Sequence, residues 1–92
     1  MTTRAIKTVR IAADLGIHLR AAGVLVQIAG RFSADIWIER EGTRANGKSI
    51  MSVLALAAGK GAELTVIGEG SDAVEAVDAI VQLVEDSFII PG

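Results

Sequence analysis

The chain contains no cysteine and no tyrosine, and aromatic residues make up only 3% of its 92 residues. Without cysteine, it can form neither a disulfide framework nor a thiolate metal site. Its aromatic residues are Phe32, Trp37 and Phe88, and no run of basic residues accompanies them. Proteins that bind nucleic acid combine a basic surface with stacking side chains. We therefore do not expect nucleic acid as a partner.

Strong net charge and long apolar runs are lacking as well. Nine basic and eleven acidic residues give a formal net charge of −2. No segment is apolar over the length of a membrane span, and residues 1–14 hold no apolar run long enough for a signal peptide. With one histidine and scattered carboxylates, the sequence favours neither a metal site nor a bound cofactor. We expect a cytoplasmic protein that contacts no membrane.

What the sequence has in plenty is aliphatic side chains, since hydrophobic residues make up 51% of the chain. Alanine, valine, isoleucine and leucine must therefore build the core. A chain of this length has room for one core, so we expect residues 1–92 to form a single domain.

Hydrophobic periodicity predicts seven elements in the order βαββαβα. Residues 6–12 are rich in β-branched side chains and predict a strand, and apolar residues recur at helical spacing over 19–32. Residues 33–41 and 43–46 predict two strands joined by a tight turn, and hence an antiparallel hairpin. Predicted core positions in this half are Val9, Ile11, Ala22, Leu25, Ile28, Ala29, Phe32, Ile36 and Ile38.

A short helix and a strand follow the hairpin. Ser49 is a favourable N-cap for a helix that Gly59 and Gly61 would end. Residues 62–70 then predict the fourth strand. The apolar positions of these two elements are Ile50, Val53, Leu54, Ala57, Leu64 and Val66.

The last predicted helix covers residues 72–88. Asp72 and Glu75 have the spacing of a capping box at its start. Its apolar stripe consists of Val74, Val77, Val81, Val84 and Phe88. The sequence IIPG at the end of the chain is interpreted as a tail.

The economical packing of these elements is an α+β fold, a four-stranded sheet with one face covered by the helices. Trp37 and Ile67 have the opposite parity to the core residues of their strands, so both should lie on the uncovered face. Two interpretations stay open for them: an ordinary exposed apolar pair, or a contact for a dimer or a partner.

The only histidine, His18, precedes the first turn of the helix predicted over 19–32. Free backbone N–H groups and the positive end of the helix dipole make this position suitable for an anion. A neutral imidazole is a nucleophile, and the guanidinium of Arg20 has donors that match phosphate oxygens. The pattern fits reversible phosphorylation of the imidazole, and an unspecialised surface position in a loop is the alternative.

Two serines add further alternatives. Ser49 or Ser52 could act as a nucleophile with His18 as its base, but the chain has no nucleophile-elbow motif and little room for a substrate pocket. As an N-cap, Ser49 would accept a backbone N–H, and a phosphate at the same place would be stabilised by the helix dipole. The residues alone do not decide between a structural and a regulatory role for Ser49.

Two motifs, GIHLRAA at 16–22 and NGKSIMSVLAL at 46–56, resemble the signature stretches of the histidine-containing phosphocarrier family, HPr, of the phosphoenolpyruvate-dependent phosphotransferase system. Their separation matches too, and the similarity extends from about residue 6 to residue 88. The resemblance implies an open-faced β-sandwich, in which a four-stranded antiparallel sheet carries three helices on one face. It also implies a stoichiometric carrier, rather than an enzyme, that takes a phosphoryl group from enzyme I and passes it to an enzyme IIA domain.

The resemblance also implies roles for individual residues. His18 would accept the phosphoryl group through Nδ1, and Arg20 would steady it. Ser49 would be phosphorylated by a dedicated ATP-dependent kinase, HPr kinase/phosphorylase, and this modification would hinder transfer at the histidine. The implied docking patch for partners is Leu19, Ala21, Lys48, Ile50, Met51 and Leu54.

The chain departs from the family pattern G-[IL]-H-A-R-P-A at two positions. Leu19 stands in place of alanine, and Ala21 in place of proline. Proline in a first helical turn presets φ and lacks an unused donor, so Ala21 returns one N–H group. Neither change removes His18 or Arg20, but both bear on transfer rate and partner choice.

Two alternatives belong to other functional classes. A regulatory HPr-like protein would be phosphorylated on Ser49 and dock to enzymes or transcription regulators, with little phosphotransfer. A structural adaptor would assemble through the open sheet face around Trp37. The presence of both His18 and Arg20 favours the carrier. We expect a monomer, with a weak dimer through the open face as the alternative.

Overall fold

The computed structural model describes residues 3–89, and its helices and strands follow the predicted order. They are β1 (Arg4–Arg10), α1 (Leu19–Ala29), β2 (Asp35–Arg40), β3 (Thr43–Asn46), α2 (Ile50–Ala55), β4 (Glu63–Glu69) and α3 (Ala73–Glu85). Of the predicted tail, residues 90–92 lie outside the described residues. The single domain expected over 1–92 therefore stays a prediction.

The four strands form one antiparallel sheet in the order β1-β4-β2-β3. β4 pairs along its length with β1, from Arg4↔Glu69 to Arg10↔Glu63, and on its other side with β2. The hairpin between β2 and β3 turns at Glu41 and Gly42, with φ of 48° and 82°. A two-residue hairpin turn requires these left-handed values, because they match the twist of the strands.

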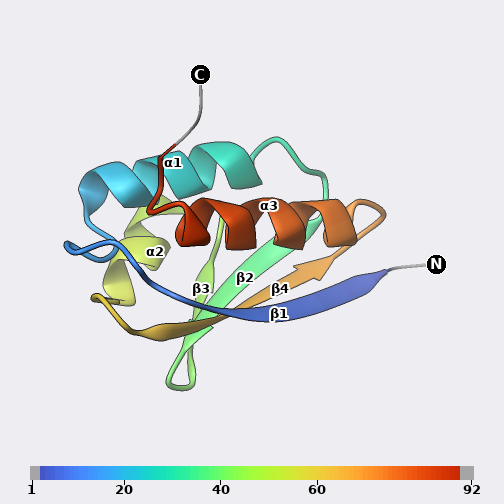
Figure 1. The fold of residues 1–92 in the computed structure, drawn as a ribbon. Helices are drawn as coiled ribbons and strands as arrows, with labels where there is room; N and C mark the ends of the chain where they lie inside the picture. The colour runs from blue at the N-terminus through green and yellow to red at the C-terminus, as the bar shows by residue number, and fades with distance from the viewer. Residues whose placement is uncertain (1–2, 90–92) are drawn as a thin grey trace.

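All three helices lie on the same side of this sheet, as Figure 1 shows. Between the two layers, the side chains that alternate along β2 and β4 are fully buried: Ile36, Ile38, Leu64 and Val66 are at most 1% exposed. The open-faced sandwich predicted from the sequence is thus confirmed. Within residues 3–89, no helix combines the length and the apolar character needed to cross a membrane.

The start of α3 differs from the prediction in two ways. Asp72 makes no capping bond, because its carboxylate turns to the chain before β2 and accepts from the N–H groups of Ser33 (3.0 Å) and Ala34 (2.8 Å). Val74 is 48% exposed, so the predicted apolar stripe is wrong at that position. The buried face instead has helical spacing from the first residue of α3 and consists of Ala73, Ala76, Val77, Ile80, Leu83 and Val84.

All three helices end earlier than predicted, and α3 stops at Glu85. α1 stops at Ala29, and tight turns follow it, in which the N–H groups of Arg31 and Phe32 donate to Ile28 and Ala29. α2 ends at Ala55 rather than at the glycines. The turn after this helix includes Ala57, which is exposed and has a left-handed φ of 49°. No glycine is therefore needed at the end of α2.

The open face of the sheet carries Trp37 and Ile67, as their parity predicts. The two residues are directly paired across β2 and β4, and Ile67 also pairs with Ile6 of β1. Because neighbours on both strands cover it, Ile67 is only 3% exposed, so the interpretation of an exposed pair is wrong for this residue. The guanidinium of Arg44 lies 5.6 Å from the centre of the Trp37 ring.

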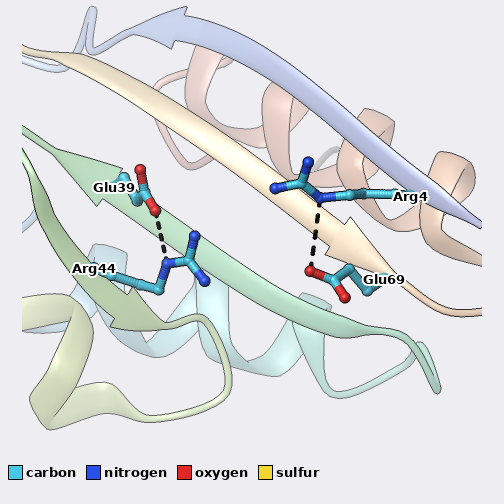
Figure 2. Close-up of polar contacts among 4 residues, drawn as sticks. All are labelled: Arg4, Glu39, Arg44 and Glu69. Atoms are coloured by element: carbon cyan, nitrogen blue, oxygen red, sulfur yellow. Dashed lines mark hydrogen bonds and ion pairs between the residues drawn. The ribbon is translucent and has the colours of Figure 1, made fainter.

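Ion pairs occupy the sheet surface on either side of this apolar row. Figure 2 shows Arg44 beside Glu39 and Arg4 beside Glu69 on the face turned away from the helices. The Arg44 Nε lies 2.6 Å from Glu39 Oε2, and the Arg4 Nε lies 3.7 Å from Glu69 Oε1. Such exposed pairs contribute little stability, but they surround the apolar row with charge.

Stability should depend on pH through Asp72. The N–H of Ser33 foremost, and that of Ala34, hold the pKa of this carboxyl below its ordinary value. A lowered pKa stabilises the fold above the unfolded-state value, about 3.9, and this contribution is lost as the pH falls through the folded-state pKa. Asp72→Asn should therefore unfold at a lower temperature than the parent at pH 7, and the difference should narrow below about pH 4.

Thermal unfolding followed by circular dichroism from pH 7 to pH 2 would measure this difference. Asp35→Asn removes an exposed carboxylate at the start of β2 and is the matched control. An Asp72→Asn variant whose unfolding temperature differs from that of the parent by the same amount at every pH would contradict the assignment.

Candidate functional site

His18 is the N-cap of α1. Its backbone is extended (φ −89°, ψ −179°), and its Nδ1 accepts a hydrogen bond from the N–H of Arg20 at 3.2 Å. A ring nitrogen that accepts carries a lone pair, so the proton of the neutral ring is on Nε2. The side chain is exposed. The structure therefore presents a nucleophilic nitrogen at the surface, directed at the first turn of a helix.

The loop before His18 is attached to the segment that precedes β4. The N–H of Ile17 donates to the carbonyl of Ala58 at 2.9 Å. Gly16 has a φ of 64°, and a Cβ at this residue would lie 2.4 Å from the same carbonyl oxygen. Only glycine allows this close approach, so Gly16 fixes the position of the loop that leads to His18.

An ion pair lies beside the same contact. Lys60 Nζ is 2.8 Å from Asp14 Oδ1. Their hydrogen bond, together with their opposite charges, holds the pKa of Asp14 below its ordinary value and raises the pKa of Lys60. Both groups are at the surface, so the pair orients the loop more than it stabilises the fold.

The electrostatic environment of His18 favours an anion. The first turn of α1 contains no acidic residue that would compensate the positive end of the helix dipole. The exposed Arg20 lines a cavity of about 50 Å³ together with His18 and Ala21. The structure thus brings the two residues predicted for phosphoryl transfer to one small surface cavity.

Residues of the segment after α3 complete this cavity, and no sequence pattern indicated this role for them. Ser87, Phe88 and Ile89 form its remaining wall. Phe88 belongs to the predicted apolar stripe of the last helix. Its side chain is 6% exposed, so its predicted burial is confirmed. No local pattern could have indicated the contact, because α1 and α3 approach each other only through the tertiary fold.

Ser49 caps α2, as predicted. Its backbone is extended, and its Oγ accepts from the N–H of Ser52 at 3.3 Å. The first turn of this helix also lacks an acidic residue. Ser49 is half-buried at the start of a helix that packs against α1.

Five of the six predicted docking residues have side chains that are exposed or half-buried, and can therefore contact a partner. Leu19 and Met51 are 67% and 75% exposed, and Ile50 is 39% exposed. Leu54 is half-buried, and Lys48 is exposed, with its Nζ donating to the carbonyl of Phe32 at 2.7 Å. The remaining residue, Ala21, is 1% exposed and can contribute little contact area.

A larger cavity of the molecule lies away from these residues. It has a volume of about 220 Å³ and is a mostly apolar groove between α1 and α3, lined by Ile28, Phe32 and Leu83 among others. Neither His18 nor Ser49 borders it. Residues 3–89 contain no group of three or more His, Asp or Glu side chains placed to hold a metal ion.

Comparison with known proteins agrees with this geometry. A family model described as the PTS HPr component phosphorylation site matches residues 5–86. The phosphocarrier protein HPr of Treponema pallidum is 46% identical over 83 residues, which cover 90% of this chain and 94% of that protein. The HPr-like protein Crh of Halalkalibacterium halodurans is 40% identical over 79 residues, which cover 86% and 94%.

The fold has a close counterpart among solved structures. The crystal structure of the phosphocarrier protein HPr from Bacillus anthracis matches with a TM-score of 0.86 and 43% sequence identity, over 89% of this chain and 98% of that one. Family model, relatives and fold therefore agree over nearly the whole described chain, and the identity is higher to the carrier than to Crh. This chain belongs to the HPr family, the phosphocarrier proteins of the phosphotransferase system.

Proposed function

We propose that this chain carries phosphoryl groups in the cytoplasm, accepting them from enzyme I on Nδ1 of His18 and passing them to a histidine of an enzyme IIA domain. The observation that carries the proposal is the His18 Nδ1 lone pair, directed at the start of α1, beside Arg20. One group is accepted and one is delivered, so the chain acts as a stoichiometric intermediate and not as an enzyme.

In the accepting step, the Nδ1 lone pair attacks the phosphorus of the charged donor. The bond from phosphorus to the donor breaks, its electron pair stays with the donor, and the new N–P bond forms on His18. Because Nδ1 holds no proton beforehand, no base is required to remove one. The exposure of His18 allows the donor to approach in line.

The phosphorylated state would be held by donors already in place. Once Nδ1 bonds to phosphorus, it can no longer accept from the N–H of Arg20, now at 3.2 Å. A negatively charged phosphoryl oxygen is a stronger acceptor and takes over this hydrogen bond. The guanidinium of Arg20 adds a full positive charge, and the absence of acidic residues from the first turn removes a source of repulsion.

The surface next to the site suits transient partners. Leu19, Ile50 and Met51 project apolar side chains into solvent. The exposed polar residues Arg20 and Lys48 are close to them along the chain. We propose these three, with Lys48 and Leu54, as the docking surface for enzyme I and IIA domains. Small apolar patches with a polar rim are typical of short-lived complexes.

Regulation is proposed at Ser49 through HPr kinase/phosphorylase. A phosphate on Ser49 would lie at an uncompensated helix N-terminus, which favours negative charge. It would also add about two negative charges beside the docking surface and thereby hinder partner binding. In the alternative function, that of a regulatory HPr-like protein, this modification and not His18 would carry the activity.

We propose that the chain is a monomer. On the open sheet face, Ile67 is already buried by its own neighbours, and Arg44 lies over Trp37. The apolar surface left for a second molecule is mainly Ile6, at 49% exposed, which lies on β1 between the ion pairs Arg4–Glu69 and Arg10–Glu63.

Phosphorylation by phosphoenolpyruvate and an active enzyme I should yield an acid-labile, base-stable phosphate on His18. His18→Asn should abolish this label while keeping a side chain that can cap α1, so its unfolding temperature should stay close to that of the parent. The label is measured by mass spectrometry and the fold by circular dichroism. Label that persists on His18→Asn would place the acceptor elsewhere.

Incubation with ATP and the kinase should give an acid-stable phosphate on Ser49. Ser49→Ala should lose it and also lose roughly 1 kcal/mol of stability with the cap. Ser52→Ala should keep the label, because Ser52 contributes only its backbone N–H to the cap. A chain labelled on Ser49 but never on His18 would favour the regulatory alternative over the carrier.

Sedimentation equilibrium should give the monomer mass for the parent. Ile6→Lys adds charge at the β1 end of the row formed by Ile6, Ile67 and Trp37, and should leave that mass unchanged. A parent of twice this mass, reduced to monomer by Ile6→Lys, would instead establish a dimer through the open sheet face.

A further inference from the structure

The segment after α3 reaches the His18 cavity with an unusual backbone. Ser87 and Phe88 both lie in the left-handed region, at φ 55° and 63°. Left-handed residues often follow a helix, but glycine or asparagine usually occupies the position, because a Cβ is disfavoured there. The turn of the backbone therefore does not explain why a serine stands at position 87.

Contacts with the core hold this turn in place. The N–H of Phe88 donates to the carbonyl of Leu83 at 2.8 Å, and the N–H of Ser87 donates to that of Val84 at 3.1 Å. The Phe88 side chain packs in the core at 6% exposed, whereas Ser87 stays half-buried at the surface. The position of Ser87 is thus determined by its neighbours on both sides.

Ser87 adjoins the space around the imidazole from two directions. It lines the cavity of about 50 Å³ that holds His18 and Arg20. It also lines a shallower depression with His18, Asp14 and Leu15. His18 and Ser87 are the two residues that border both hollows, so a group attached to the imidazole would come close to the serine.

We propose that Ser87 is a phosphoryl-binding residue: its hydroxyl donates a hydrogen bond to a phosphoryl oxygen when His18 is phosphorylated. A serine hydroxyl rotates freely and can aim its proton at an anion without adding charge. A hydrogen bond to a charged oxygen is stronger than one between neutral groups. No covalent bond to Ser87 forms or breaks. The inference rests on the proposed function, since it requires His18 to carry the phosphoryl group.

A competition for phosphoryl groups tests the proposal. Ser87→Ala and Ser87→Gly both remove the hydroxyl, but only glycine also relieves the left-handed backbone. Each variant is mixed with an equal amount of parent chain of distinguishable mass, a limiting amount of phosphoenolpyruvate and a trace of enzyme I. At equilibrium, mass spectrometry should find about tenfold less phosphoryl group on either variant than on the parent.

The control and the stability measurements separate a chemical role from a structural one. Ser33→Ala, at an exposed serine before β2, should share the phosphoryl groups equally with the parent. Ser87→Gly should unfold at a higher temperature than Ser87→Ala, because alanine is strained in a left-handed backbone. Both variants should nevertheless carry the same reduced share of phosphoryl groups at equilibrium.

Equal sharing by both Ser87 variants would overturn the role of Ser87 and leave the carrier function standing. If Ser87→Gly takes up as much phosphoryl group as the parent and Ser87→Ala does not, the role of Ser87 is overturned too. The defect of Ser87→Ala would then come from the strained backbone and not from the lost hydroxyl. A parent chain that enzyme I never labels on His18 would overturn the proposed function itself, and the role of Ser87 with it.

Discussion

The antiparallel pairing of β4 with both β1 and β2 is the constraint on which the rest of the molecule depends. β4 is the last strand along the chain, yet it lies inside the sheet and contacts the first strand and the hairpin. α3 starts at the end of β4, where the N–H of Gly70 donates to the carbonyl of Thr3. Its thirteen residues span about 20 Å, close to the roughly 23 Å of a seven-residue strand. α3 therefore ends where β1 ends.

This return path creates the candidate site. β1 leads into the loop that carries His18, and α3 brings Ser87 back to the same end of the sheet (Figure 1). The loop is attached to the segment before β4 through Ile17 and Ala58. His18 is exposed at this end and borders two open hollows, so the proposed chemistry would take place at the surface. That placement fits the proposed function, in which one partner after another would reach His18.

Much of the fold follows from patterns among residues that are close together in the sequence. Alternation along β2 and β4 placed Ile36, Ile38, Leu64 and Val66 in the core, where all four are buried. Ser49 was predicted to cap its helix and does so, because a cap involves residues only three apart. The same local reasoning failed for Asp72. Its spacing to Glu75 fits a capping box, but two N–H groups before β2 compete for its carboxylate.

By itself, the sequence determined the order of the elements, the faces of the strands, the position of His18 before a helix and the family that its motifs resemble. These properties depend on residues a few positions apart. Tertiary structure alone decided that Ile67 is buried, that Val74 is exposed, and that Ser87 lies beside His18. The physical reason is that each of these depends on which strand or helix packs alongside. A contact between distant segments exists only once β4 has paired and α3 has returned across the sheet.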